Sequence, residues 1–333
     1  MRRNRLVPIG LAVLSAVWAQ DPAPWRDPSS HTVQFVTVEE GVRLEVLDWG
    51  GSGRTVVLIP GLGNTAHVFD EFAPKLAAGF HVYGITRRGF GESSAPASGY
   101  DADRLADDVL AVLDSLKISK PVLAGHSLGG EELSSIGSRH PDRVAGLIYL
   151  DAGYSYAFDN GKGMTIEAQS EAIKKPPPMG PFPVVADRAS FSAFGEWYQR
   201  TDGIRMPEAE IRQLYNARPD GGIGLPRTQL RVAPAILAGF KKFTDIRAPV
   251  LAIFAVPHET PPWLGSADAP VRSRFESSNA DFEALAEKQV KAFEEGVAGA
   301  RVVRVPNAHH YVFISNEAEV LREMRAFLAQ SKP

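Results

Sequence analysis

The chain has 333 residues, of which 44% are hydrophobic and 23% charged, with a net charge of −3 and no cysteine. This composition is that of a globular protein and excludes collagen, coiled coils and long disordered tails. The lack of cysteine excludes disulfides, and no stretch beyond the N-terminus is apolar for long enough to cross a membrane. The length is compatible with one large α/β domain.

The N-terminus has the pattern of an export signal. Three arginines precede an apolar run over residues 6–18, and Ala19 is a small residue of the kind that a signal peptidase requires. We predict a signal peptide over residues 1–19 and a secreted or periplasmic protein of bacterial type. The alternative is that this apolar run forms a short core helix, but Pro8 and Gly10 are unfavourable in a helix. Cleavage would change the net charge from −3 to −6, so no nucleic-acid partner is expected.

Apolar runs later in the chain predict a mostly parallel sheet. Two β-rich runs, at residues 32–38 and 42–48, indicate an antiparallel hairpin. Five nearly continuous apolar runs follow, which are typical of strands buried on both faces. They cover residues 56–59, 82–85, 122–124, 147–150 and 250–254. Helical patterns at 101–116 and 128–139 lie between them, and this alternation predicts a doubly wound α/β sheet.

The alternation stops between about residues 153 and 247, where proline-rich and aromatic segments predict an inserted helical cap. This cap is either a lid over a pocket or a small subdomain that buries its own aromatic residues. A Pro/Ser-rich loop to Asn279, a helix at 282–295, a strand at 301–305 and a helix at 317–329 are expected after the strand at 250–254. The predicted division is a signal peptide (1–19), a first part of the core (20–152), the cap (153–247) and a second part of the core (248–333).

The most informative local motif is Gly125-His-Ser-Leu-Gly129, between the strand at 122–124 and a helical pattern. In a nucleophile elbow, small flanking residues let the helix approach the strand, and the serine takes a strained backbone conformation. The helix N-terminus directs free N–H groups at any oxyanion formed there. Ser127 is therefore the candidate nucleophile.

A reactive serine needs a general base, which can lie far along the chain. His309 and His310 follow the strand at 301–305 and should reach the same sheet edge as Ser127, so one of them is the candidate base. The apolar residues that come next favour His310. His67 either lines the pocket or lies on a helix surface. The histidines assigned to the surface or to the core are His31, His81 and His140.

The orienting acid should lie between nucleophile and base in chain order. We prefer Glu259, because it follows the strand at 250–254, whose neighbour leads to His310. Asp151, directly after the strand at 147–150, is the alternative acid. If Asp151 is not catalytic, its side chain would cap a helix or a loop.

An oxyanion needs two backbone N–H donors. Leu128, directly after Ser127, supplies one, and Leu62 in the loop Pro60-Gly-Leu-Gly-Asn64 supplies the other. This glycine-rich loop lacks the spacing of a nucleotide-binding motif, and no Lys-Ser/Thr pair follows it. No cofactor and no metal are expected.

Four segments in this order resemble motifs of the α/β-hydrolase superfamily, and the resemblance runs from about residue 32 to residue 329. They are Pro60-Gly-Leu-Gly, Arg88-Gly-Phe-Gly-Glu-Ser93, Gly-His-Ser-Leu-Gly-Gly130 and Asn307-Ala-His-His310. The resemblance implies Ser127 as nucleophile, His310 as base, and Leu62 and Leu128 as oxyanion donors. It leaves the acid open, because the family most often has Gly-x-x-Asp where this chain has Ala255-Val-Pro-His-Glu259.

A serine in place of aspartate argues against haloalkane dehalogenases and epoxide hydrolases. The resemblance implies a serine hydrolase of carboxylic esters that acts through an acyl-enzyme on a small-molecule substrate. One alternative is hydrolysis of a lactone, an amide, an N-terminal proline or a carbon–carbon bond. Another is a small-molecule-binding protein without turnover. A metal site is a further alternative for four residues that lack the helical spacing of zinc motifs, namely His258, Glu259, His309 and His310.

Overall fold

The computed structural model describes residues 25–174 and 177–330, and the predicted signal peptide lies outside them. The strands are β1 (Thr32–Glu39), β2 (Val42–Asp48), β3 (Thr55–Ile59), β4 (His81–Ile85), β5 (Val122–His126), β6 (Gly146–Leu150), β7 (Tyr215–Ala217), β8 (Ile223–Pro226), β9 (Val250–Phe254) and β10 (Arg301–Arg304). The α-helices are α1 (Ala73–Ala77), α2 (Ala102–Ser115), α3 (Gly129–Arg139), α4 (Ile166–Lys174), α5 (Phe191–Asp202), α6 (Glu208–Leu214), α7 (Val232–Ala238), α8 (Ala269–Gly296), α9 (Val312–Ser315) and α10 (Glu317–Gln330). The 3₁₀ helices are η1 (Ala66–Phe69), η2 (Pro141–Arg143) and η3 (Pro262–Ser266).

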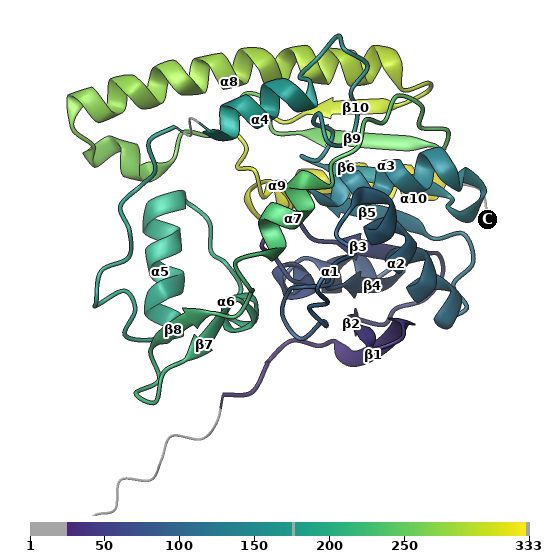
Figure 1. Cartoon of the computed structure of the whole chain (residues 1–333), viewed down its shortest axis with the longest axis horizontal. Coiled ribbons are helices and arrows are strands. Elements are labelled where there is room, and N and C mark those ends of the chain that lie inside the picture. Colours follow the sequence, from purple (N-terminus) through teal and green to yellow (C-terminus); the bar gives the residue numbers. More distant parts are fainter. Residues whose placement is uncertain (1–24, 175–176, 331–333) are drawn as a thin grey trace, which may run out of the picture.

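Eight strands form one sheet in the order β1-β2-β4-β3-β5-β6-β9-β10 (Figure 1). The predicted hairpin of β1 and β2 is confirmed, and β2 also pairs antiparallel with β4. Every other neighbouring pair in this sheet is parallel. The doubly wound, mostly parallel α/β sheet predicted from the sequence is therefore confirmed.

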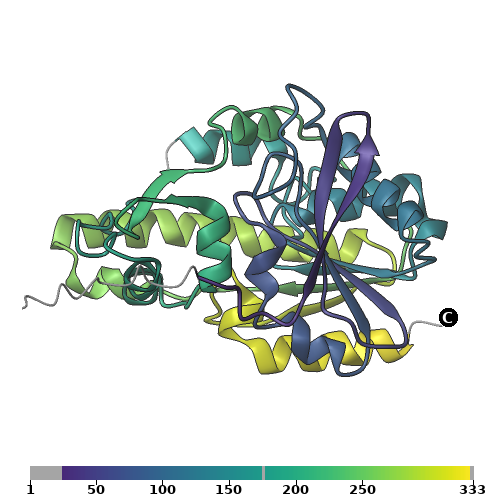
Figure 2. The same ribbon diagram turned by 90° about the horizontal axis from the view of Figure 1, so that it is seen from below.

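The central strands are buried on both faces, as their continuous apolar runs predict. Successive residues enter two different hydrophobic cores: Val57 and Leu123 pack on the side of α2 and α3, whereas Val56 and Val122 pack on the side of α1 and α10. Figure 2 shows α10, in yellow, on the opposite side of the twisted sheet from α2 and α3. The carboxyl ends of the parallel strands are thus held rigidly at one edge.

The chain between β6 and β9 forms α4 to α7 and the small β7–β8 sheet, which stay outside the large sheet (Figure 1). Helices α5 and α6 pack on each other, and α6 packs on η1. Residues 153–247 were predicted as a cap, and the bounds of that cap stay a prediction. No helix within the described ranges is both long enough and apolar enough to span a bilayer.

One expected element is wrong. The sequence suggested a loop up to Asn279, but a single helix, α8, begins at Ala269. Pro270 lies in its first turn, where the missing N–H has no helical partner to lose. None of residues 269–280 is buried, so this half of the helix lacks the apolar stripe by which a helix is recognised in a sequence.

Candidate active site

Ser127 lies on a tight turn between β5 and α3, at the carboxyl edge of the parallel strands. Its φ angle is +48°, a left-handed conformation that is strained for a residue with a side chain. The turn depends on small neighbours, because a Cβ on Gly125 would lie 2.6 Å from the carbonyl oxygen of Gly129. The hydroxyl of Ser127 is therefore presented at the N-terminus of α3.

Three residues from separate strand ends meet beside this turn. Asp151 follows β6, His258 lies beyond β9, and His310 follows β10 through a short loop. His310 Nδ1 donates to Asp151 Oδ2 over 2.6 Å, and His258 Nε2 donates to the same oxygen over 3.0 Å. The ring of His310 also packs 4.7 Å from the ring of His126, the residue before Ser127. We call Asp151, His258 and His310 the Asp151 cluster.

Asp151 is a fully buried carboxylate with four hydrogen-bond donors. Besides the two imidazoles, the Tyr154 hydroxyl donates to Asp151 Oδ1 at 2.9 Å and the Ala255 N–H does so at 3.0 Å. Burial by itself would raise the pKa of Asp151, but the bonds from His258 and His310 outweigh it and hold the pKa well below its ordinary value. This carboxylate is ionised at neutral pH and can both orient His310 and stabilise a positive charge on it.

His258 is bound on both ring nitrogens, since its Nδ1 donates to Glu283 of α8 at 2.9 Å. Burial alone would lower the pKa of His258, but Asp151 and Glu283 raise the pKa to about 10. His258 is therefore an imidazolium at neutral pH. The side chain of His310 is the more accessible of the two, at 38% exposed against 14%.

The acid in contact with His310 is Asp151, which corrects the preference for Glu259. The N–H of Glu259 donates to a backbone carbonyl in the loop before His310, so that the chain is extended here and consecutive side chains point to opposite sides. His258 faces Asp151, and Glu259 faces away. A Cβ on Gly203 would lie 2.9 Å from Glu259 Oε1, so this carboxylate lies at the end of α5.

The two neighbouring imidazoles of the C-terminal loop have different surroundings. The His309 ring stacks on Tyr311 with 5.6 Å between ring centroids, and its Nδ1 accepts from the Tyr311 N–H at 3.1 Å. Burial and the nearby His310 lower the pKa of His309 to about 4, so His309 is neutral. The four-residue metal site considered from the sequence is not assembled, because neither His309 nor Glu259 belongs to the Asp151 cluster. The three residues of that cluster do place one possible ligand atom each within 4.8 Å of the others.

The loop from Pro60 to Asn64 approaches Ser127 so closely that only glycine fits at one position. A Cβ on Gly61 would lie 2.9 Å from the Cβ of Ser127 and 3.1 Å from Nδ1 of His126. Leu62, a predicted oxyanion donor, directly follows Gly61. Leu128, the other, directly follows Ser127 and precedes the first residue of α3.

Arg87 holds this loop through its backbone carbonyl oxygens. Its buried guanidinium donates to the carbonyl oxygens of Gly61 at 3.2 Å and Pro60 at 3.0 Å. A 2.5 Å ion pair with Glu132 of α3 orients the guanidinium. The backbone of the loop is therefore held through two of its carbonyl oxygens, which suits preorganised N–H donors.

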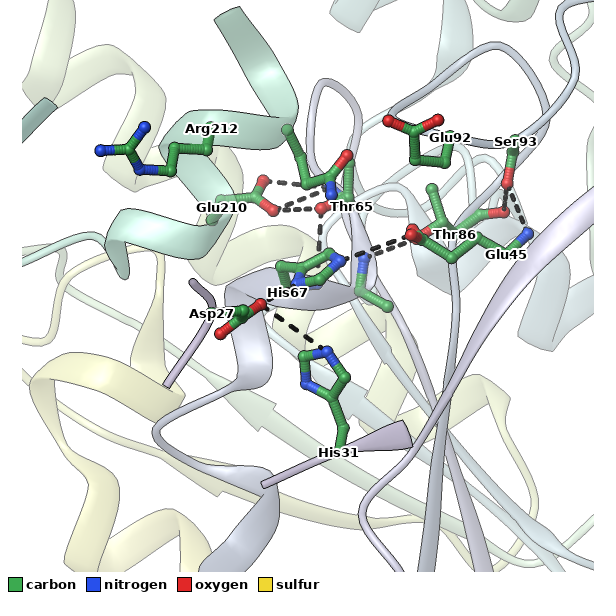
Figure 3. A network of polar contacts seen from close by, with 12 residues as sticks. Asp27, His31, Glu45, Thr65, His67, Thr86, Glu92, Ser93, Glu210 and Arg212 are labelled. Carbon is green, nitrogen blue, oxygen red and sulfur yellow. Dashed lines mark hydrogen bonds and ion pairs between the residues drawn. The ribbon is translucent and has the colours of Figure 1, made fainter. Parts of the chain in front are cut away.

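A carboxylate from α6 holds the other end of the same loop. Buried Glu210 of α6 accepts from Asn64 Nδ2 at 2.9 Å, from the Thr65 N–H at 3.0 Å and from the Thr65 hydroxyl (Figure 3). The Tyr311 hydroxyl donates to Asn64 Oδ1 at 2.9 Å. Burial raises the pKa of Glu210 to about 7, although the bonds from Thr65 and Asn64 oppose the shift.

Sequence reasoning missed the roles of His258, Tyr154 and Tyr156. Tyr156 is buried, which raises the pKa of its phenol, and so does the charge of Asp151, while the Ser127 side chain opposes this shift. A neutral phenol therefore lies beside Ser127. The signal for His258 was its position just after β9, because β9 is the neighbour of β6 and both strands end at the same edge.

Comparisons with known proteins agree with this fold. The family model described as "Alpha/beta hydrolase family" matches residues 56–323. A superfamily protein of Bacillus subtilis, YisY, is 33% identical over 130 residues, which are 39% of this chain and 48% of that protein. A 2-(acetamidomethylene)succinate hydrolase of Mesorhizobium japonicum is 30% identical over 101 residues, 30% of this chain and 36% of that protein. Each match thus covers less than half of the relative's length.

The solved structures extend the likeness to almost the whole chain. The crystal structure of E-2-(acetamidomethylene)succinate hydrolase has a TM-score of 0.60 and 19% identity, and it covers 90% of this chain and 99% of that one. A carboxylesterase from Bacillus subtilis has a TM-score of 0.54 and 16% identity, covering 90% and 92%. At such identities the structures show the fold alone. Since the family model matches most of the chain, the protein belongs to the α/β hydrolase family.

Proposed function

We propose that this protein is a serine hydrolase of carboxylic esters, with Ser127 as nucleophile, His310 as general base and Asp151 as orienting acid. The observation that carries the proposal is the position of His310. Its Nδ1 lies 2.6 Å from Asp151 Oδ2, and its ring packs 4.7 Å from His126, next to Ser127. With Nδ1 bound to the carboxylate, Nε2 is the nitrogen that can take the serine proton.

In the proposed acylation, the Ser127 oxygen attacks the carbonyl carbon of the ester, and its proton passes to His310. The backbone N–H groups of Leu62 and Leu128 donate to the oxyanion of the tetrahedral intermediate. As the carbon–oxygen bond breaks, His310 gives the proton to the leaving alcohol, and the acyl group stays on Ser127. Water then repeats both proton transfers and releases the carboxylic acid.

The buried environment of Asp151 supports this cycle. The donors Tyr154, Ala255 and His258 keep the carboxylate ionised and fixed while His310 gains and loses a proton. His258 is thus a positioning residue, since it acts on His310 through Asp151. Its own charge is balanced by Glu283.

The decisive experiment is hydrolysis of p-nitrophenyl acetate and butyrate by the full chain, with fluorophosphonate labelling followed by peptide mapping. We expect turnover of at least one ester and a single label on Ser127. No label and no turnover, together with thermal stabilisation by small molecules, would instead identify a binding protein. Labelling of Ser127 without ester turnover would replace the ester by another acyl bond, such as a lactone or an amide.

We also propose that the chain is exported. This proposal is supported by the three arginines and the apolar run within residues 1–19. N-terminal sequencing of the protein from the periplasm and medium of a bacterial expression host should give a start at Gln20. Recovery only in the cytoplasm with residues 1–19 intact would contradict it.

A further inference from the structure

A second group of imidazoles and carboxylates lies outside the Asp151 cluster, where the segment before β1 meets η1 (Figure 3). Asp27 and His31 precede β1, His67 lies in η1, and Asp70 directly follows η1. One possible ligand atom from each of the four lies within 4.8 Å of the others. We call these residues the N-terminal cluster, and we propose that it binds one zinc ion as a four-ligand structural site.

The distances between the ligand atoms suit a tetrahedral ion. His67 Nδ1 lies 3.1 Å from Asp70 Oδ2 and 3.5 Å from Asp27 Oδ2, and His31 Nε2 lies 3.7 Å from Asp27 Oδ2. With zinc bonds of about 2.0–2.2 Å, tetrahedral ligand atoms are about 3.3–3.5 Å apart. Small side-chain shifts therefore bring these atoms to bonding distance of a common centre.

The atoms that would not bind the ion already have outer partners. Asp70 Oδ1 accepts from His31 Nδ1 at 2.7 Å and from Trp49 Nε1 at 3.2 Å. His67 Nε2 faces Glu45 Oε1 at 3.5 Å, on the side of the ring away from Asp27 (Figure 3). Zinc-bound histidines usually donate their second N–H to such a carboxylate or carbonyl. These bonds fix the tautomers that leave His31 Nε2 and His67 Nδ1 free for the metal.

Glu45 is itself held in place. Its Oε2 accepts from the Thr86 hydroxyl at 2.8 Å, and its backbone N–H donates to the Ser93 hydroxyl at 2.9 Å. Glu45 lies on β2, so the outer partner of His67 is part of the rigid sheet. A zinc site needs such an ordered outer layer, and this cluster has it on the side of the core.

The donor set favours zinc over the alkaline-earth ions. Two imidazoles with two carboxylates are a ligand set for Zn²⁺, whereas Ca²⁺ and Mg²⁺ prefer oxygen ligands alone. Four protein ligands close the coordination shell, which is typical of structural and not of catalytic zinc. Within residues 25–174 and 177–330, no lysine or arginine forms an ion pair with Asp27, Glu45 or Asp70. In this described part of the chain, imidazoles are the only basic side chains that pair with these three carboxylates.

The cluster is buried but not closed to an ion. The side chains of His31 and His67 are 3% and 4% exposed, whereas that of Asp27 is 26% exposed. Asp70 also lines a cavity of about 610 Å³ that is bounded by Trp25 and by α5 and α6. A bound ion would tie the segment before β1 to η1, a few residues beyond the loop that contacts Ser127.

The test is zinc titration of the full chain after its metals have been removed with a chelator. We expect one tightly bound zinc per chain, measured by competition with a chromophoric chelator, and the visible absorption of tetrahedral Co²⁺ when cobalt replaces zinc. His31→Asn and Asp27→Asn should each weaken zinc binding by about 100-fold. Asp27 is partly exposed and lies before the first strand, so its variant should fold even if the His31 variant does not.

Two controls separate this site from other histidines. His81 forms a single pair with Asp48 at 2.9 Å, so His81→Asn should bind zinc as the wild type does. His258→Asn should also retain the zinc, which would exclude the Asp151 cluster as its location. Zinc should raise the melting temperature of the wild type in a concentration-dependent way and that of Asp27→Asn much less. The proposal is overturned if the wild type binds no stoichiometric zinc, which would identify a metal-free hydrogen-bonded cluster, or if both cluster variants bind zinc unchanged.

Discussion

The Asp151 cluster and the N-terminal cluster use the same residue types in different surroundings. In each, one carboxylate contacts two imidazoles: Asp151 contacts His258 and His310, and Asp70 contacts His31 and His67. His310 is partly accessible beside a serine on a left-handed turn, whereas both imidazoles of the N-terminal cluster are almost completely buried. The two clusters therefore differ less in their ionisable residues than in their surroundings. The candidate catalytic site has an accessible imidazole and a neighbouring hydroxyl on a strained backbone turn, and the candidate structural site has neither.

The largest expected effect comes from removing the hydroxyl that distinguishes the two clusters. Ser127→Ala should lower kcat/KM for p-nitrophenyl butyrate by about four to six orders of magnitude, because the members of a triad act as a unit. Ser138→Ala is the matched control, since Ser138 lies on α3 and donates only to the backbone oxygen of Asp245 at 2.6 Å. A Ser127→Ala protein that kept a tenth of the activity would remove the basis of the comparison.

The next effect concerns Asp151, the carboxylate that His258 and His310 share. Asp151→Asn should lower kcat by about three to four orders of magnitude, because an amide cannot stabilise the imidazolium and can favour the wrong tautomer of His310. Glu259→Gln should change kcat by less than about threefold, since the Glu259 carboxylate lies at the end of α5. Steady-state kinetics of both proteins, with circular dichroism to check folding, would decide. The reverse ranking would restore the acid that the sequence favoured.

A smaller effect is expected from the second imidazole on Asp151. His258→Asn removes a positively charged imidazole. The ring centroid of His258 lies 6.4 Å from that of His310. Asp151 then keeps three of its four hydrogen-bond donors, so the carboxylate is held less firmly against His310. We expect kcat to fall by about tenfold as Asp151 loses a fixed donor. An unchanged kcat would mean that His258 is only a packing residue.

Much of the fold could be predicted because the relevant signals are local. The runs at residues 56–59, 122–124, 147–150 and 250–254 are all strands, and each is apolar on both faces. The start of α8 could not be predicted, because none of residues 269–280 is buried and the first turns therefore lack a continuous apolar stripe.

The site was partly predictable for the same reason. The turn at Ser127 needs small neighbours and so has a local motif, but the acid is set by which side chain faces inward at a strand end. Asp151 has a φ angle of +47°, a strained conformation that the sequence does not reveal. His31 and His67 lie on separate segments, and only the fold brings them together.

The last effect is on stability and not on turnover, and it tests the segment that joins the two clusters. Glu210 holds Asn64 and Thr65, between Gly61 beside Ser127 and His67 in the N-terminal cluster. Burial raises the pKa of Glu210 from 4.5 to about 7. Its neutral form is therefore favoured in the folded state, and its contribution to stability is complete below pH 4.5 and is lost as the pH rises through about 7.

Glu210→Gln imitates the neutral acid at every pH. Between pH 4.5 and pH 7.5 the free energy of unfolding of the wild type should fall by roughly 3 kcal/mol relative to this variant. Urea denaturation at several pH values measures the difference. Glu208 lies on the same helix but forms a surface pair with Arg212 at 2.6 Å. The free energy of unfolding of Glu208→Gln should therefore change with pH as that of the wild type does. If the free energy of unfolding of Glu210→Gln also changes with pH as that of the wild type does, Glu210 does not titrate in this range. The segment between the clusters is then held by packing instead of by a buried acid.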